Sequence, residues 1–496
     1  MLRKIRITLA IIFWVGVTML FLDFTGVIRP WIGWLAKIQL IPAILAINVG
    51  VVTALLLLTL LLGRVYCSVI CPLGVTQDFI GWLGRRGSNR HRYKYRYSHA
   101  ITWLRVAMLV IFVIALIAGI AVIPALIEPY SIYGRFVSST LGPLAITINN
   151  LLADMASKAD SYTFYTLGYR MQSLAVVAVA LIEVAVIAVL AWRNGRTWCN
   201  TICPVGTLLG FISRVSWLKP VIDTSKCVNC GLCARSCKGA CIDAANHAID
   251  YSRCVACMDC IDNCTHGAIS YTTRRPKADK PSGGDKVDES RRAFVTGIGI
   301  AAATSAVKAA SNKVDGGLAA ITDKKAPART TPIVPPGAVS LRHLQQHCTA
   351  CQLCVSSCPN GVLRPSTDLS RFMQPVSSYE NGYCRPECTE CGDACPAGAI
   401  LPVTVEEKSA IQIGRAVWIK DNCIPLVDGV PCGNCARHCP SGAITMIASV
   451  ADDPESIQIP MVDTEKCIGC GACEYVCPAR PFSAIYVEGN ERHREI

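Results

Sequence analysis

The sequence has little histidine, and none where a membrane-embedded haem would need it. Every histidine lies outside the long apolar stretches of the chain: His91, His99, His247, His266, His343, His347, His438 and His493. A b-type haem between transmembrane helices takes histidine or a similar axial ligand from within them. Cys-x2-Cys-His, the attachment motif of c-type haem, is also absent. The sequence therefore predicts that neither b-type nor c-type haem carries electrons through this chain.

Charged residues are also scarce, at 17% of the chain against 52% hydrophobic residues. The apolar residues crowd into the first 200 positions, whereas most of the 29 cysteines lie beyond them. No Gly-rich nucleotide loop is present, and no constellation for organic catalysis stands out. The composition predicts a membrane part followed by a soluble part. We expect the terminal reduction to take place on another protein.

Four apolar stretches are long enough to cross a hydrocarbon core of about 30 Å, which takes about 20 residues. They run from Ile7 to Ile28, from Ile38 to Leu62, from Ile101 to Ile127 and from Met171 to Trp192. We therefore expect an α-helical bundle of four spans over residues 1–222, embedded in a lipid bilayer.

Basic residues flank these stretches and account for much of the net charge of +13. They include Arg3, Lys4 and Arg6, the loop from Arg85 to Arg96, and Arg193, Arg196 and Arg214. Cytoplasmic loops of membrane proteins collect such residues. We expect both ends of the bundle in the cytoplasm, the loop from Pro129 to Arg170 outside, and no nucleic-acid partner.

The bundle contains an internal repeat. The segment GRVYCSVICPLG, residues 63–74, matches GRTWCNTICPVG, residues 195–206. Each copy follows an even-numbered span, so Cys67, Cys71, Cys199 and Cys203 are expected together at the cytoplasmic face. Four thiolates suffice for a [4Fe-4S] cluster, and each pair could also close as a redox-active disulfide. A third interpretation is that Pro72 and Pro204 simply cap helices there.

Most remaining cysteines form runs typical of bacterial ferredoxins, Cys-x2-Cys-x2-Cys-x3-Cys, whose fourth cysteine ligates the neighbouring cluster. The two runs of residues 223–271 predict one cluster on Cys227, Cys230, Cys233 and Cys264 and another on Cys254, Cys257, Cys260 and Cys237. The four runs of residues 341–496 are Cys348, Cys351, Cys354, Cys358; Cys384, Cys388, Cys391, Cys395; Cys423, Cys432, Cys435, Cys439; and Cys467, Cys470, Cys473, Cys477.

These 24 cysteines predict six [4Fe-4S] clusters on α+β ferredoxin-like modules. Zinc is the alternative, but zinc ribbons use two separated pairs of ligands rather than repeated runs of four. Two runs have longer spacings, Cys384-x3-Cys388 and Cys423-x8-Cys432, and the pairing of fourth ligands among the last four runs stays open. Cys241 belongs to no run.

A polar connector, residues 272–340, separates the two cysteine-rich regions. Its first part is too rich in Lys, Asp, Gly and Pro to fold alone. Arg291 and Arg292 then precede a mildly apolar stretch to about residue 310. This pattern is typical of a twin-arginine export signal, here internal. If the segment is retained rather than cleaved, it would form a fifth span; an Ala-rich linker helix is the alternative.

Glu183 lies in the middle of the fourth apolar stretch. An ionisable residue at that depth is costly and is by default a functional candidate. We predict a proton acceptor for quinol, and the alternative is a carboxyl group bonded to a neighbouring helix.

Together these motifs resemble two known families. The two Cys-x3-Cys-Pro motifs followed by a two-cluster module resemble NapH, a membrane quinol dehydrogenase subunit. The twin-arginine segment followed by four cysteine runs is similar to the NapG and MauM ferredoxin-type proteins. The resemblance implies a subunit of the bacterial inner (cytoplasmic) membrane that takes electrons from quinol or menaquinol. It would pass them to a periplasmic reductase or c-type cytochrome, with the C-terminal domain in the periplasm.

Two other functions stay open. One is an accessory or assembly factor for a respiratory metalloenzyme, and the other is a relay between a cytoplasmic ferredoxin pool and the membrane.

Overall fold

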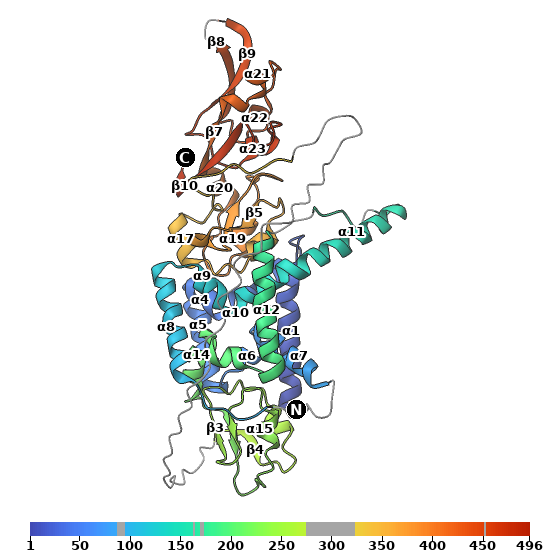
Figure 1. The fold of residues 1–496 in the computed structure, drawn as a ribbon, viewed down its shortest axis with the longest axis vertical. Coiled ribbons are helices and arrows are strands. Elements are labelled where there is room, and N and C mark those ends of the chain that lie inside the picture. Colours follow the sequence, from blue (N-terminus) through green and yellow to red (C-terminus); the bar gives the residue numbers. More distant parts are fainter. Residues whose placement is uncertain (87–94, 162–163, 169–172, 274–322, 451–452) are drawn as a thin grey trace, which may run out of the picture.

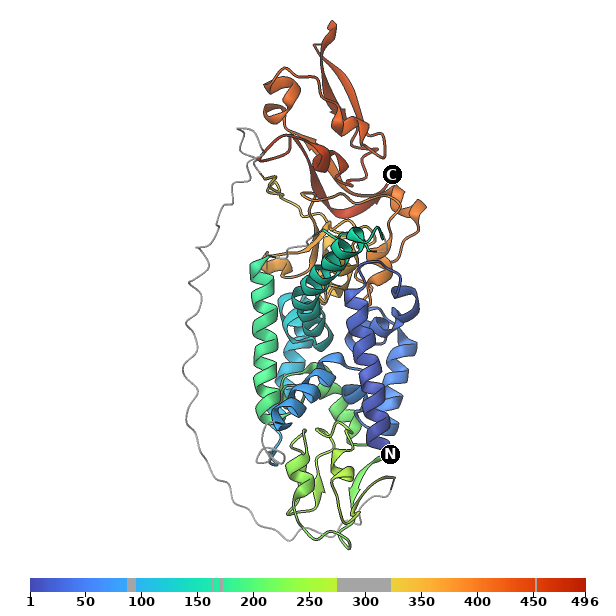
Figure 2. The same ribbon diagram turned by 90° about the vertical axis from the view of Figure 1, so that its right-hand side faces the viewer.

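A computed structural model describes residues 1–86, 95–161, 164–168, 173–273, 323–450 and 453–496. A helical bundle occupies the middle of the molecule, and cysteine-rich regions lie at its two opposite ends (Figures 1 and 2). The N-terminus lies at the same end as residues 223–271, whereas residues 341–496 form the other end. We call these regions the two-cluster module and the four-cluster domain, and the adjoining ends of the bundle the two-cluster face and the four-cluster face.

The bundle is built from helices of very different length. They are α1 (Leu2–Leu22), α2 (Arg29–Ile32), α3 (Trp34–Lys37), α4 (Leu40–Leu45), α5 (Val49–Leu62), α6 (Val65–Val69), α7 (Pro72–Arg86), α8 (Thr102–Ala118), α9 (Val122–Ile127), α10 (Pro129–Phe136), the π-helix η2 (Val137–Leu141), α11 (Gly142–Lys158), α12 (Leu174–Asn194), α13 (Thr197–Thr201) and α14 (Pro204–Ser213).

Three helical segments of the described residues are long and apolar enough to cross a membrane: Leu2–Leu22, Pro129–Lys158 and Leu174–Asn194. The first and third confirm the outer two of the four expected spans. The expectation of a single helix is wrong for the other two. The stretch from Ile38 is interrupted before α5, where the Asn48 side chain caps a new helix by accepting from the Val51 amide at 3.2 Å. The stretch from Ile101 is interrupted at Gly119, whose φ of 71° ends α8.

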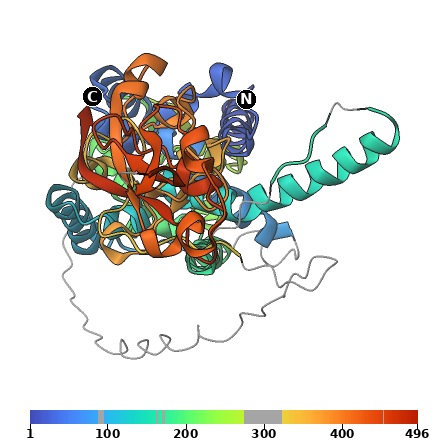
Figure 3. The same ribbon diagram turned by 90° about the horizontal axis from the view of Figure 1, so that it is seen from above.

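The expectation of a loop from Pro129 to Arg170 is also wrong, because residues 129–158 are helical. Glu128 caps α10 through the Ser131 amide, and Pro129 takes the first helical position, where its missing N–H costs nothing. Helix α10 is buried inside the bundle. Helix α11 then projects sideways from it (Figures 1 and 3).

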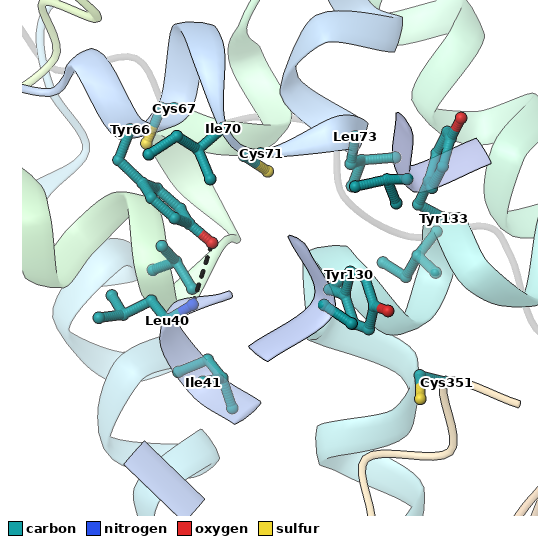
Figure 4. Packing of buried hydrophobic residues seen from close by; sticks show 14 of the residues in the cluster. Leu40, Ile41, Tyr66, Cys67, Ile70, Cys71, Leu73, Tyr130, Tyr133 and Cys351 are labelled. Carbon is teal, nitrogen blue, oxygen red and sulfur yellow. Dashed lines mark hydrogen bonds between the residues drawn. The ribbon is translucent and has the colours of Figure 1, made fainter. Parts of the chain in front are cut away.

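One hydrophobic core runs through the bundle and includes residues of both cysteine-rich regions. Val255 of the two-cluster module belongs to it, as do Cys351 and Leu353 of the four-cluster domain. Figure 4 shows part of this core, with Cys67 and Cys71 at one end, Cys351 at the other, and the rings of Tyr66 and Tyr130 between them. The bundle thus packs directly against ligand loops at both ends.

The two-cluster module follows α14 without a linker. Together with strand β1 (Lys219–Ile222), which directly precedes it, the module contains two antiparallel strand pairs. Strand β1 pairs with β4 (Ile269–Thr272), and β2 (Ile242–Asp243) pairs with β3 (Ala248–Ile249). Its two short helices are α15 (Leu232–Ser236) and α16 (Asp259–Asp262). The pairing of β1 with β4, in register Lys219 to Thr272, brings the two ends of the module together.

The four-cluster domain has more extensive strands. Its pairs are β5 (Leu363–Pro365) with β6 (Pro375–Ser377), β7 (Ile411–Trp418) with β10 (Ile485–Glu495), and β8 (Ile444–Val450) with β9 (Asp453–Val462). Its helices are α17 (Leu341–His347), α18 (Leu353–Ser357), η3 (Leu369–Arg371), α19 (Glu390–Ala394), α20 (Val405–Ala410), η4 (Lys420–Asn422), α21 (Ile424–Val427), α22 (Asn434–Arg437) and α23 (Ala472–Val476). The twin-arginine segment, residues 290–310, lies outside the described residues.

Candidate metal centres

The two-cluster module contains two small cavities, each surrounded by cysteines. One is lined by Cys227, Cys230, Cys233 and Cys264, and the other by Cys237, Cys254, Cys257 and Cys260. These are the groups that the ferredoxin crossover combines. Gly231 allows the first loop to turn tightly, because its φ of 70° is readily reached only without a Cβ atom.

The second cavity of the module has a fifth cysteine. Cys241 is 1% exposed and lines the same cavity, with its Sγ atom 3.4 Å from that of Cys237. Its spacing in the sequence gave no sign of this position. Five thiols therefore line this cavity, although four are enough to ligate one [4Fe-4S] cluster.

In the four-cluster domain two further cavities combine the third and fourth runs. Cys423, Cys432 and Cys435 share one with Cys477, whereas Cys467, Cys470 and Cys473 share the other with Cys439. Each run therefore supplies three cysteines to one group and its last cysteine to the other. The long spacing from Cys423 to Cys432 is accommodated by α21.

The first two runs exchange their last cysteines in the same way. Cys395 lies close enough to Cys348, Cys351 and Cys354 for the charge of its thiolate to act on theirs. Cys358 lies close enough to Cys384, Cys388 and Cys391 for the same effect. The Cys384 amide donates to the Cys470 carbonyl at 2.9 Å, which joins the second group to the group of Cys470.

The four groups of this domain therefore form a row that begins at the bundle. The group of Cys351 comes first, because Cys351 belongs to the bundle core. The groups of Cys384, Cys470 and Cys423 follow in that order away from the membrane part.

Each cavity is lined by four cysteines that the ferredoxin crossover combines, the number of thiolates that a [4Fe-4S] cluster takes. Among the residues that the structure describes, no three His, Cys, Asp or Glu side chains are gathered closely enough to hold one metal ion. A [4Fe-4S] cluster binds each thiolate through a different iron atom, so its ligands stand further apart than those of a tetrahedral zinc ion. Four-cysteine cavities of this kind fit the cluster.

The two copies of the bundle repeat face each other. Arg64 of the first copy donates from Nη2 to the Cys199 carbonyl of the second at 3.3 Å. Arg196 of the second donates from Nη1 to the Cys67 carbonyl of the first at 2.7 Å. This exchange makes the pair nearly symmetric. Gly74 and Gly206 permit it, because a Cβ atom at either would overlap the same carbonyl groups.

The repeat brings its four thiols into one buried group. Cys67, Cys71, Cys199 and Cys203 are 3–4% exposed. Cys71 and Cys203 each lie within electrostatic range of both Cys67 and Cys199. Cys203 also caps α14 by accepting from the Gly206 amide at 3.4 Å. The thiols therefore form a possible ligand set, and two others also accept hydrogen bonds, Cys199 from Gln77 and Cys67 from Arg64.

Charged groups attach the two-cluster module to this group of thiols. Asp78 forms ion pairs with Arg6 at 3.0 Å, Arg196 at 2.8 Å and Lys238 of the module at 3.3 Å. Lys238 also pairs with Asp259 at 3.0 Å. Burial alone would raise the pKa of Asp78, but the three cations outweigh that effect and hold the pKa well below its usual range.

The four-cluster domain meets the bundle by a different kind of contact. A Cβ atom on Gly134 of α10 would lie 2.5 Å from the Cys351 carbonyl, so the helix and the ligand loop touch through backbone. Arg135 donates to the Ala350 carbonyl at 3.5 Å and to Glu183 at 2.8 and 3.0 Å. Glu183 is thus the ion-pair partner of a buried arginine that contacts the first ligand loop.

These features define a multi-centre, ferredoxin-type iron–sulfur protein with apolar helices of membrane-spanning length. Comparison with known families agrees. A family described as "4Fe-4S binding domain" matches residues 44–91 and 176–223, the two copies of the bundle repeat, and a "4Fe-4S dicluster domain" matches residues 430–480.

Curated relatives identify the family. The methylamine utilization ferredoxin-type protein MauM of Methylobacillus flagellatus is 33% identical over 166 residues, 32% of this chain and 70% of MauM. The ferredoxin-type protein NapG of Escherichia coli K12 is 30% identical over 176 residues, 33% of this chain and 75% of NapG. The chain belongs to this MauM and NapG family of ferredoxin-type proteins. No solved structure matches.

Sequence reasoning missed several residues of these sites. Arg196 was interpreted as a basic residue marking the cytoplasmic side, but it is 1% exposed and bonds the facing repeat. Its counterpart Arg64 lies at the same position of the other copy of the repeat. This repetition was the sequence signal that the two arginines share a structural role. Asp78 and Lys238 meet only through the tertiary fold, so nothing in their local sequence predicts the contact.

Proposed function

We propose that this protein is a membrane-bound relay that takes electrons from quinol or menaquinol and passes them to a redox partner. A [4Fe-4S] cluster, when bound, takes up and releases one electron at a time. The observation that carries the proposal is the row of cysteine groups at the four-cluster face, whose first member, Cys351, is packed into the bundle core. The resemblance to NapH supports quinol as the donor.

The chain's residues divide this task between the two faces. The six groups of four cysteines would hold six clusters. The groups of the four-cluster domain lead away from the bundle, and the group of Cys423, at the far end of this row, is where a periplasmic reductase or c-type cytochrome would take electrons. In this proposal the four-cluster domain lies in the periplasm and the two-cluster module in the cytoplasm.

We further propose that Cys67, Cys71, Cys199 and Cys203 hold a seventh cluster rather than two disulfides. The match of both repeats to a 4Fe-4S family supports this choice. The buried arginines Arg64 and Arg196 are suitably placed to compensate the negative charge of four thiolates. The prediction that Glu183 accepts a proton from quinol is the alternative to the proton path proposed below.

The experiment is to purify the full chain anaerobically, measure its iron and add quinol. Six cubanes give about 24 iron atoms per chain, and a seventh gives about 28. Serine at all four repeat cysteines should lower iron by about four atoms and abolish quinol-dependent reduction of the clusters of the two-cluster module. The control is Thr201→Val, which gives the second repeat the residue that the first has at Val69.

Two results would contradict the proposal. Stoichiometric zinc with little iron would exclude the clusters. Normal quinol-dependent reduction of the two-cluster module in the four-serine variant would show that the repeat cysteines are structural. An assembly factor, unlike a relay, need not oxidise quinol at all.

A further inference from the structure

A cavity of about 640 Å³ lies between the bundle and the four-cluster domain. This volume is within the range of about 300–1,000 Å³ that is usual for small-molecule sites. The cavity has two chemically different sides. Phe21, Phe24 and Ile146 line it from the bundle, whereas polar groups of Asn360 and Arg385 line it from the domain. A ligand with a polar ring at one end and a hydrocarbon tail at the other would match both sides.

Polar groups in the wall of the cavity lack partners. Ser138, on η2, is 8% exposed, and its hydroxyl group has no hydrogen-bond partner. A buried hydroxyl group without a partner is unfavourable because it has lost its hydrogen bonds to water. Within the described part of the chain, the Arg385 guanidinium forms no ion pair, whereas Arg364 beside it is paired with Glu380. A bound ligand with hydroxyl or carbonyl oxygens would satisfy both Ser138 and Arg385.

The cavity adjoins the ligand loops of the first two cysteine groups. Its wall includes Val355 and Ser356, which lie between Cys354 and Cys358. It also includes Pro359 and Arg385, which directly follow Cys358 and Cys384. Cys358 and Cys384 belong to the same group, so a ligand in the cavity lies beside that group on two sides.

We propose that this cavity binds the headgroup of a quinol, with the hydrocarbon tail along Phe21, Phe24 and Ile146. The inference rests on the proposed function and assigns its substrate site. Oxidation breaks the two O–H bonds of the quinol and leaves two carbonyl groups. The two electrons pass one at a time to oxidised [4Fe-4S] clusters of the adjoining groups.

The residues of the cavity determine where the protons go. Tyr165 and Tyr475 line the cavity and are 59% and 40% exposed, so water reaches its rim. Both protons pass to that water, because Glu183 does not line the cavity. The charge of Arg385 favours the deprotonated quinol over the neutral form.

The test uses the full chain with its clusters and a photoreactive azido-naphthoquinone. Labelling should fall on peptides that contain residues 138–146 or 355–385. Arg385→Gln should weaken the apparent affinity for menadiol about tenfold, because a charged hydrogen bond is lost. Asn381→Trp, at an exposed position of the cavity wall, should block labelling. Arg415→Gln is the control, since Arg415 is exposed on β7 and lies outside the cavity.

The readouts separate this inference from the proposed function. In every variant the clusters should still be reduced by dithionite with unchanged electron paramagnetic resonance spectra. Labelling near Glu183 on α12, or equal affinity in Arg385→Gln and Arg415→Gln, would overturn the cavity assignment and leave quinol oxidation standing. If the wild-type chain is neither labelled nor reduced by menadiol, the proposed function fails together with the site.

Discussion

The two cysteine-rich regions are attached to the same bundle by different physical means. At the two-cluster face Asp78, Lys238 and Asp259 form a buried charged network, beside the apolar contact of Val255. At the four-cluster face the Cys351 loop enters the apolar core beside Gly134. A charged network depends on every member remaining paired, whereas an apolar insertion depends on shape. The two faces should therefore fail under different changes.

The difference also concerns what each contact places together. At the two-cluster face, the Arg196 amide donates to the Lys238 carbonyl at 2.9 Å, and Lys238 follows the cluster ligand Cys237. The module is thereby held next to the four thiols of the repeat. At the four-cluster face, Tyr130 lies within electrostatic range of both Cys351 and Tyr66. Each face thus brings a ligand loop against the bundle interior.

The largest effect is expected from Asp78→Asn. The change leaves Arg196 buried without a carboxylate and leaves Lys238 with Asp259 alone, and the two cationic side chains are 1% and 7% exposed. Breaking a buried ion-pair network in this way costs about 3–5 kcal/mol. Hydrogen exchange should increase throughout β1 and β4 and stay unchanged in β7 and β10.

Asp154→Asn is the matched control for this change. Its pair with Lys158 is exposed at 58% and 73%, and such pairs contribute little. Equal exchange in the two variants would mean that the charged network does not hold the module.

A smaller effect, on the four-cluster domain rather than on the two-cluster module, is expected from Gly134→Ala. A Cβ atom at residue 134 would lie 2.5 Å from the Cys351 carbonyl, and such overpacking costs about 1–3 kcal/mol. Exchange should increase in α18 and leave the two-cluster module unchanged. In Gly50→Ala the nearest atom lies 3.8 Å away, so that control should be neutral or slightly stabilising. Stabilisation by both changes would show that the helix and the ligand loop are not in contact.

The smallest effect concerns salt. Arg3 and Asp262 at the two-cluster face form a 2.7 Å pair whose side chains are 40% and 47% exposed. At 1 M salt the screening length is about 3 Å, so this pair is weakened by less than about 1 kcal/mol. Proteolysis of the two-cluster module should become slightly faster. The four-cluster domain should respond less, because the arginine of its ion pair with the bundle, Arg29 with Glu390, is only 9% exposed. A larger response of the four-cluster domain would reverse the comparison.

The cysteine groups could be predicted because each loop is local. Cys227 to Cys237 spans a single loop, and the crossover rule supplies the remaining ligand, so the groups of the two-cluster module follow from spacing. The exchange of Cys439 and Cys477 between the third and fourth runs could not be predicted from spacing. With four runs, several pairings satisfy the same crossover rule. The packing of the third and fourth runs against each other selects one.

The membrane part was less predictable, for reasons visible at particular residues. Hydropathy does not register the cap at Asn48 or the left-handed turn at Gly119, and both divide apolar stretches that look continuous. Helix α10 was taken for part of an outside loop because it lies between the third and fourth apolar stretches and the basic residues predicted both ends of the bundle in the cytoplasm. In the fold Arg135 is paired with Glu183 and buried, so its charge does not mark a surface.

The central claim is that the two cysteine-rich regions lie on opposite sides of a membrane and are joined through the bundle. A reporter that is active only outside the cytoplasm, fused after Ile496 in one chain and after Tyr271 in another, tests it most directly. We predict activity for the fusion after Ile496 and none for the fusion after Tyr271. The same outcome for both fusions, active or inactive, would place the two regions on one side of the membrane and contradict the account.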